Sequence, residues 1–168
     1  MIDDFLKCAG RTIIAIDPGA SGAIVWIGDS LPVQAMEMPP TLRDIWDLLG
    51  DIKREAVTSN NSLFCAIEKV GTYMPGNSGP SAAKFAEHIG ALKMALIGTG
   101  IRHEFILPNH WMTSLLGDAK PKGSDAASKR LRKNAIKAKM QEIFVDQKVT
   151  LTTADALGIL YYALKKEV

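Results

Sequence analysis

The chain has 168 residues, of which 47% are hydrophobic and 23% are charged, and its net charge is +2. These values exclude an intrinsically disordered chain, and no apolar run reaches the ~20 residues that a transmembrane helix requires. The length predicts one domain over residues 1–168. Cys8 and Cys65 lie 57 positions apart without metal-ligand spacing, which argues against a disulfide framework and against a zinc site. With the acidic start Met1-Ile2-Asp3-Asp4, these features predict a soluble, intracellular protein without a secretory signal or membrane association.

The positive charge is concentrated in one segment. Residues 119–139 hold eight basic residues and one acidic residue, Asp125, whereas the remainder holds twelve basic and seventeen acidic residues. A basic segment on an otherwise acidic chain is typical of a protein that binds a polyanion. A solvated helix face is the alternative explanation for such a run of charge.

The first half of the chain reads as three strands, a helix and a fourth strand. Apolar runs over 12–17 and 22–27 predict two strands joined by a Pro-Gly turn, and Val33–Met38 predicts a third, antiparallel strand. Thr41 is the expected cap of a helix over Leu42–Val57. The continuous apolar run Leu63–Ile67 is typical of a central strand that is covered on both faces.

The second half predicts a loop over Gly71–Pro80, a helix capped by Ser81, a strand and three further helices. We expect helices over Ala82–Ile97, Asn109–Leu116, Lys129–Phe144 and from Thr152 or Thr153 to Lys166, a strand over His103–Leu107, and a polar, mobile loop over Gly117–Ser128. This order predicts an α/β domain with a mixed five-stranded sheet, whose first three strands are antiparallel and whose two faces are covered by helices.

Three acidic residues stand beside apolar residues at the ends of predicted elements. Asp17 ends the first strand, Glu68 follows Leu63–Ile67, and Asp155 lies in the first turn of the last helix. Carboxylates suit Mg²⁺, and two such ions about 3.5–4 Å apart can clamp the attacking and leaving oxygens of phosphodiester hydrolysis. Taken singly, each Asp also has a structural explanation, as a turn former or as a charge favoured by the helix dipole. Their joint occurrence in this order favours a metal site.

Three segments that carry these residues resemble the RuvC family of Holliday junction resolvases, and above all its short, phage-type members. They are Ala15-Ile16-Asp17-Pro18-Gly19 with Ser21-Gly22, Ala66-Ile67-Glu68-Lys69-Val70, and Ala154-Asp155-Ala156-Leu157-Gly158-Ile159. Pro108-Asn109-His110-Trp111, followed by the basic segment, is a further match, and the resemblance spans about residues 12–165.

The resemblance implies a ribonuclease H-like fold, a homodimer, and paired nicking of four-way DNA junctions with Mg²⁺, for which Mn²⁺ can substitute. It implies that Asp17, Glu68 and Asp155 are catalytic metal ligands. It also implies a cytoplasmic, DNA-associated protein of a bacterial or phage-infected cell, with a role in DNA recombination and repair.

The chain departs from the family pattern at Thr152, where the family normally has an Asp or a His as a fourth ligand, three residues before the last Asp. A neutral hydroxyl is a poorer ligand for a hard cation than a carboxylate. Three explanations are open. Thr152 binds the metal through its hydroxyl or a water, a neighbour such as Asp146 takes its place as a ligand, or catalysis is weakened or lost. We expect weaker binding of a second metal ion in an otherwise working site.

Two further groups of residues are expected to bind DNA. In related resolvases the loop after the Glu approaches the junction centre, so Tyr73, with Met74 second, is the candidate for stacking on an unpaired base, although Tyr73 can equally pack this loop against the body. The basic segment supplies the candidate phosphate ligands Lys120, Lys122, Lys129, Arg130, Lys133 and Lys137. Of these, Lys129 and Lys133 are the candidates for stabilising the transition state at the scissile phosphate.

Three alternatives accompany the junction endonuclease. They are a ribonuclease H-like nuclease that cuts flaps, forks or duplex DNA, a junction-binding protein with weakened catalysis, and a fragment of an actin-like ATPase. The last is disfavoured because the chain has no second Asp-Gly phosphate loop and is too short for two such lobes. The helix over Ala82–Ile97 either forms the dimer face or packs wholly within the monomer.

Overall fold

The structure, a computed structural model, describes residues 10–28, 31–71 and 79–166. Its five strands are β1 (Arg11–Asp17), β2 (Ala23–Gly28), β3 (Leu31–Glu37), β4 (Ser62–Glu68) and β5 (Arg102–Ile106). Its helices are α1 (Leu42–Thr58), α2 (Gly79–Gly98), α3 (Pro108–Leu116), the short 3₁₀ helix η1 (Gly117–Ala119), α4 (Ala126–Ile143) and α5 (Ala154–Lys166).

The strands form one mixed sheet in the order β3-β2-β1-β4-β5, which confirms the predicted five strands and the antiparallel arrangement of the first three. The strand β1 pairs in parallel with β4, and β4 pairs in parallel with β5. Pro32 lies in β3, an edge strand, where a residue without an amide hydrogen is tolerated.

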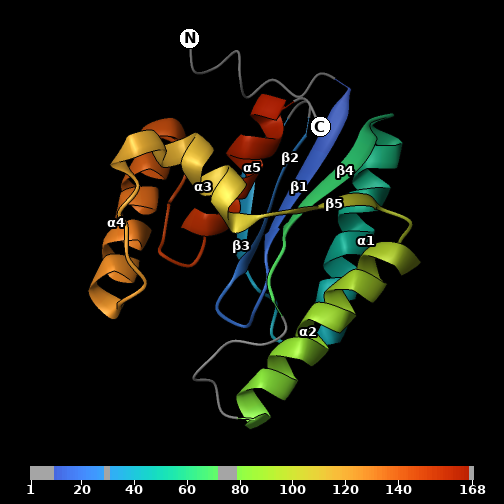
Figure 1. The fold of residues 1–168 in the computed structure, drawn as a ribbon. Helices are drawn as coiled ribbons and strands as arrows, with labels where there is room; N and C mark the ends of the chain where they lie inside the picture. The colour runs from blue at the N-terminus through green and yellow to red at the C-terminus, as the bar shows by residue number, and fades with distance from the viewer. Residues whose placement is uncertain (1–9, 29–30, 72–78, 167–168) are drawn as a thin grey trace.

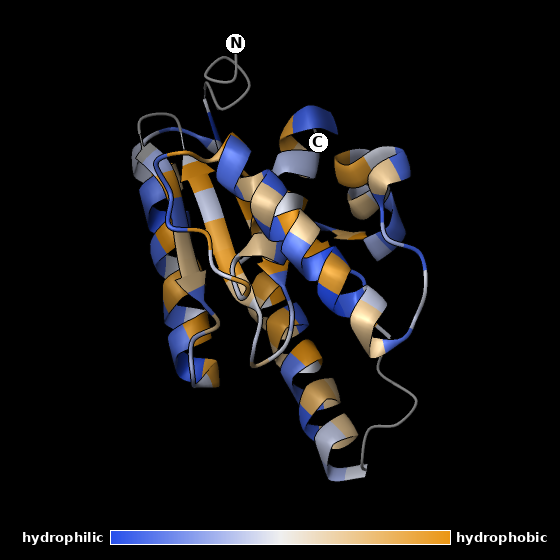
Figure 2. Ribbon diagram, turned by 90° about the vertical axis from the view of Figure 1, so that its left-hand side faces the viewer, coloured by the Kyte–Doolittle hydropathy of each residue, from blue (hydrophilic) through white to orange (hydrophobic). Residues whose placement is uncertain are grey.

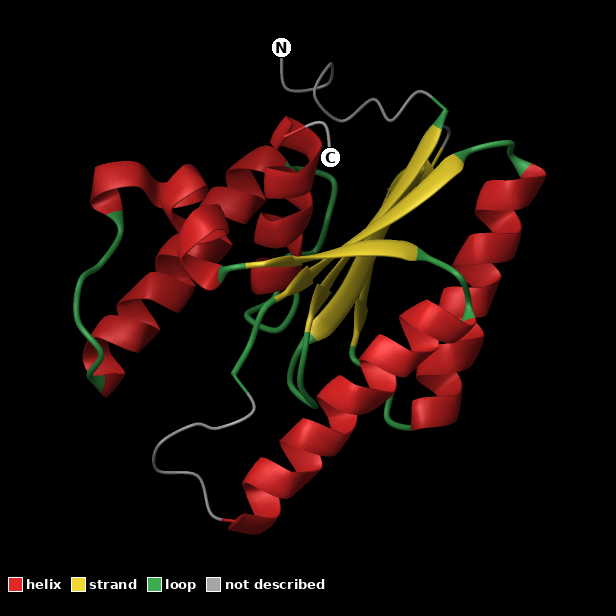
Figure 3. Ribbon diagram, turned by 45° about the vertical axis from the view of Figure 1, so that its right-hand side comes forward, coloured by secondary structure: helices red, strands yellow, loops and turns green. Residues whose placement is uncertain are grey.

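Helices cover both faces of this sheet, as predicted (Figures 1 and 3). The helices α1 and α2 lie on one side, and α3, α4 and α5 lie on the other. Side chains alternate along each strand, so the three interior strands β1, β2 and β4 supply both cores. In β1, for example, Ile14 and Ile16 pack with α1 and α2, whereas Ile13 and Ala15 pack with the helices of the other face. The strands are accordingly coloured mainly as apolar in Figure 2, whereas the helices carry mixed apolar and polar surfaces.

Two helices begin earlier than predicted, for local reasons. The helix α2 begins at Gly79, so Ser81 lies in its first turn rather than at its cap, and Gly79 and Pro80 do not belong to a loop. The helix α4 begins at Ala126 because Asp125 caps it, accepting a hydrogen bond from the amide of Ser128 at 3.0 Å. Together with η1, this makes the segment over Gly117–Ser128 partly helical instead of the loop that we expected.

One predicted helix cap is confirmed, and one of the two cysteines lies outside the described residues. The cap of α1 is Thr41, as predicted, and its hydroxyl accepts a hydrogen bond from the amide of Asp44. Cys65 is buried as a free thiol, whereas Cys8 lies outside the described residues. In the part of the chain that the structure describes, no helix is both long enough and apolar enough to cross a membrane.

Candidate metal and nucleic-acid site

Two of the predicted ligands lie side by side at the carboxyl ends of two neighbouring interior strands. Asp17 is the last residue of β1 and Glu68 is the last residue of β4, and these neighbouring parallel strands pair Ile16 with Ile67 one position earlier. Both carboxylates share a strand face with Ile13, Ala15, Phe64 and Ala66, which belong to the core beneath α3, α4 and α5. The register therefore directs both side chains to the same face of the sheet.

The third predicted ligand, Asp155, comes from the helix that lies on that face. Asp155 is the second residue of α5, whose buried residues Ala156, Leu157, Ile159 and Leu160 pack into the same core as Ala15 and Ala66. The turn before α5 is held by a reciprocal pair of hydrogen bonds. The amide of Thr150 donates to the hydroxyl of Thr153, and the amide of Thr153 donates to the hydroxyl of Thr150. This capping arrangement fixes where α5 begins and so where Asp155 lies.

The tight turn after Asp17 requires glycine. The amide of Gly22 donates to the carbonyl of Gly19 at 2.9 Å, and a Cβ atom at Gly22 would lie 2.0 Å from the carbonyl oxygen of Asp17. Gly19 has a φ of +117°, and the ring of Phe85 on α2 lies 3.3 Å from the position of its missing Cβ atom. The chain therefore makes a tight turn directly after Asp17, and α2 packs against this turn. Both contacts hold the backbone of Asp17 at the end of β1.

The three carboxylates form one electrostatic cluster. Burial, together with the negative charges of Asp155 and Glu68, raises the pKa of Asp17 to about 8. Burial also raises the pKa of Glu68 and that of Asp155, and the charge of Asp155 adds to the rise at Glu68. Three half-buried acids that oppose one another's ionisation form a site that favours a cation.

Two side chains act against this rise in pKa. Lys133 on α4 lies 3.9 Å from Oδ2 of Asp155, and its positive charge lowers the pKa of all three acids. The indole Nε1–H of Trp111 on α3 donates a hydrogen bond of 2.9 Å to Oε1 of Glu68, and this bond also lowers the pKa of Glu68. Lys133 was among the predicted DNA ligands, whereas no pattern in the sequence indicated the bond from Trp111 to Glu68.

The donor set fits Mg²⁺ in chemistry. All three side chains offer carboxylate oxygens, and Oδ1 of Asp155 is buried without a hydrogen-bond partner among the described residues. In the described part of the chain, however, no three His, Cys, Asp or Glu side chains are gathered closely enough to hold one ion together. The fit therefore rests on the unpartnered oxygen and on the mutual repulsion of the acids.

The fourth position of the expected ligand set remains neutral. Thr152 is half-buried in the turn before α5 and lies between the residues that make the capping hydrogen bonds. Asp146 is exposed, and it is not among the charged groups that perturb the pKa values of the three acids. Asp146 therefore does not take part in the carboxylate cluster. The expected fourth position is held by Thr152, three residues before Asp155.

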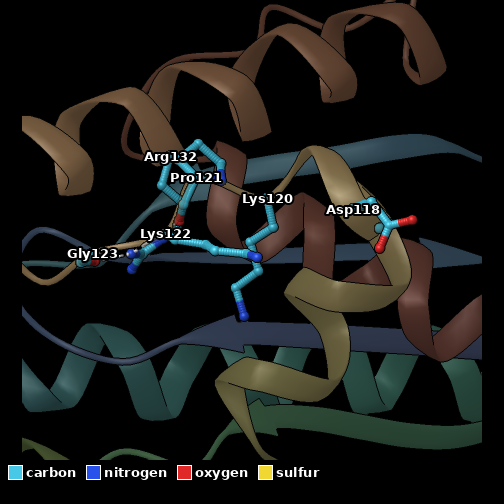
Figure 4. A pocket seen from close by; sticks show the side chains of 7 residues that line it. Asp118, Lys120, Pro121, Lys122, Gly123 and Arg132 are labelled. Carbon is cyan, nitrogen blue, oxygen red and sulfur yellow. Dashed lines mark hydrogen bonds between the residues drawn. The ribbon is translucent and has the colours of Figure 1, made fainter.

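The basic segment forms α4 and the loop that leads into it. An open pocket of about 620 Å³ lies between this region and α4, lined by Gly117, Asp118, Lys120, Pro121, Lys122, Gly123 and Arg132. Figure 4 shows Asp118 to one side of the three basic side chains. The guanidinium of Arg132 donates to the carbonyl of Gly123 at 2.7 Å, and the ammonium of Lys120 donates to the side chain of Asn109. The loop is thereby tied to α3 and α4.

The structure describes the predicted DNA ligands of α4 but not the two predicted stacking residues. Lys129, Lys133 and Lys137 follow one another at helical spacing along α4, beside the buried Ile136 and Met140, and Arg130 is exposed on the same helix. The stacking candidates Tyr73 and Met74 lie outside the described residues. The structure therefore brings Lys133 to the carboxylate cluster and leaves the roles of the other basic residues as predictions.

The fold, but not the sequence, is similar to that of known proteins. The chain matches no protein-family model and no curated protein sequence. It is similar to RuvC of Thermus thermophilus in complex with a Holliday junction substrate, with a TM-score of 0.61, 14% identity, and coverage of 94% of this chain and 95% of that chain. A second structure of Thermus thermophilus RuvC matches with a TM-score of 0.56 and 14% identity, over 94% of this chain and 96% of that chain. The fold is therefore ribonuclease H-like, as expected, and the identity is too low to carry more than the fold.

Proposed function

We propose that this chain is a Mg²⁺-dependent DNA endonuclease that resolves four-way junctions by paired phosphodiester hydrolysis. One observation carries the proposal: in a ribonuclease H-like fold, Asp17 and Glu68 end neighbouring parallel strands on the face that α5 covers with Asp155. The likeness to a RuvC that was solved with a Holliday junction substrate supports the choice of DNA as substrate. The basic segment supports it independently, because it supplies positive charge beside an acidic cluster.

The three carboxylates would hold the metal in this proposal, and Mn²⁺ would substitute for Mg²⁺. When bound, the metal would activate the attacking water and stabilise the leaving oxygen. The chain's own elements orient the ligands: β1 and β4 hold two carboxylates in register, and α5 holds the third. Lys133 balances the charge of Asp155 and would contact a phosphate oxygen of bound DNA.

Paired nicking requires two sites, so the proposal includes a homodimer of single-domain chains. The surface of α2 supports this, because Met94 and Ile97 are 62% and 61% exposed although α2 also packs Leu92 and Leu96 into the core. Apolar side chains on both sides of a surface helix are typical of a helix with a second partner. Phe85, nearer the start of the same helix, contacts the turn after Asp17, so α2 connects this exposed surface with the proposed site.

A comparison of DNA substrates tests the function. The purified chain is incubated with a synthetic four-way junction, a flap and a duplex, each with Mg²⁺, Mn²⁺ or EDTA, and its mass in solution is measured in parallel. We expect symmetric nicks in the junction alone, with either ion but not with EDTA, from a protein of twice the chain mass. Nicks in all three substrates would favour the ribonuclease H-like nuclease on flaps and forks. A gel shift without nicks would favour a junction-binding protein with weakened catalysis, the alternative that Thr152 motivates.

Removal of the charge of Lys133 is expected to slow nicking by about tenfold to a hundredfold. Lys133→Gln takes away the cation nearest to Asp155, and with it a contact to the developing charge on the phosphate. Lys139→Gln is the matched control, because it removes one positive charge from the same helix but from a side chain that pairs with Glu142. Single-turnover nicking at saturating enzyme separates the chemical step from DNA binding. Equal losses in the two variants would mean that Lys133 contributes only general charge.

A further inference from the structure

Trp111 occupies an unusual position for a core tryptophan. Its side chain is 1% exposed and belongs to the core between the sheet and the helices α3, α4 and α5. Its indole N–H nevertheless reaches the edge of that core and donates to Oε1 of Glu68 at 2.9 Å. An indole N–H can donate but cannot accept, so this contact favours the ionised carboxylate and one orientation of it.

The place of the indole ring is set by a glycine on α5. A Cβ atom at Gly158 would lie 2.7 Å from Cζ3 and 3.1 Å from Cε3 of Trp111, closer than real contacts allow. Gly158 follows Asp155 by three residues, so both lie on one side of α5. The same helix face therefore presents one proposed ligand directly and seats the ring that contacts another.

We propose that Trp111 is a positioning residue that pre-orders the Glu68 carboxylate for the metal, and that Gly158 is required to admit its ring. This inference rests on the proposed function, because it takes Glu68 to be a metal ligand. The bond engages Oε1, and Oε2 of Glu68 would remain available to a metal ion. Fixing a Glu side chain in advance removes rotamer entropy that binding would otherwise lose, and partners of this kind typically change metal affinity by 10–100-fold.

Direct measurement of metal binding tests the inference. Trp111→Phe keeps an aromatic ring in the core and deletes the N–H donor. We expect Mn²⁺ to bind this variant about tenfold more weakly by calorimetry, and the Mg²⁺ midpoint of nicking to rise equally, with little change in rate at saturating metal. Gly158→Ala is expected to weaken Mn²⁺ binding in the same direction, because its methyl group displaces the ring.

Trp26→Phe is the matched control. The indole nitrogen of Trp26 is also buried but has no hydrogen-bond partner among the described residues, and Trp26 packs against the opposite core. This variant should bind Mn²⁺ as the wild type does. Thermal unfolding of the metal-free variants compares their folding directly, since both substitutions remove the same atoms.

The outcomes separate this inference from the proposed function. Wild-type Mn²⁺ affinity in folded Trp111→Phe, with nicking of junctions intact in the wild type, would overturn the inference alone. Weakened Mn²⁺ binding in Trp111→Phe, with no nicking of any DNA by the wild type, would support the inference and overturn the nuclease proposal. Absence of Mn²⁺ binding by the wild type would overturn both.

Discussion

Asp17→Asn is expected to abolish metal-dependent nicking and, at the same time, to stabilise the metal-free protein. Nicking should fall by at least about a hundredfold, because the variant removes a proposed ligand from the end of β1. The gain in stability comes from the same carboxylate. Without a cation, burial and the charges of Asp155 and Glu68 destabilise the ionised form of Asp17. A neutral asparagine of the same shape has no such charge to destabilise.

The gain should depend on pH in a defined direction. The pKa of Asp17 is about 8 in the folded protein, whereas the ordinary value of an aspartate side chain, which applies to the unfolded chain, is 3.8. Between these values the folded state holds a proton that the unfolded state has lost, so the stability of the wild type falls as pH rises from about 4 to about 8. Asp17→Asn lacks the part of this dependence that Asp17 contributes. In EDTA near pH 8 we expect it to be more stable by a few kcal/mol, which corresponds to a Tm higher by roughly 10 °C.

Calorimetric melting at pH 5 and pH 8, with EDTA or with Mg²⁺, measures these effects. Mg²⁺ should raise the Tm of the wild type at pH 8 and leave that of Asp17→Asn nearly unchanged. Asp146→Asn serves as a control, because Asp146 is exposed and does not perturb the cluster. A Tm for Asp17→Asn that equals the wild-type value at both pH values would mean that Asp17 is not held in a repulsive cluster.

Thr152→Asp is expected to lower the Mg²⁺ concentration required for nicking by about tenfold. The variant places a carboxylate three residues before Asp155, and affinity for a hard cation rises with the number of charged ligands. The metal-free protein should lose stability, because a fourth negative charge joins three acids that already oppose one another's ionisation. The effect on Tm in EDTA is therefore opposite in sign to that of Asp17→Asn.

Thr152→Asn is the control for this variant, since it has the same shape without the charge. It should leave the Mg²⁺ midpoint within about twofold of the wild type. Metal titrations of nicking, with melting curves in EDTA, distinguish the two variants. Wild-type nicking that already saturates at ordinary Mg²⁺, with no gain in Thr152→Asp, would contradict our expectation of a weakened second metal position.

Local patterns in the sequence predicted the elements well because those patterns arise from burial and backbone hydrogen bonding. The apolar run before Asp17 and the run Leu63–Ile67 form β1 and β4, and both contribute alternate residues to two cores. Thr41 caps α1 as expected. The starts of α2 and α4 were wrong by a few residues, because Gly79 and Pro80 read as loop residues and Asp125 follows a Gly-Ser pair.

The sequence by itself determined that three acidic residues stand at the ends of apolar elements, that a basic segment lies between the second and the third of them, and that the neutral Thr152 stands three residues before the last. These properties depend on residues close together in the chain. Only the tertiary structure decided that β1 pairs with β4, that Lys133 lies by Asp155, and that the indole of Trp111 reaches Glu68 across the space left by Gly158. Periodicity shows which side of an element is buried, but the distance between two elements depends on how side chains far apart in sequence pack together.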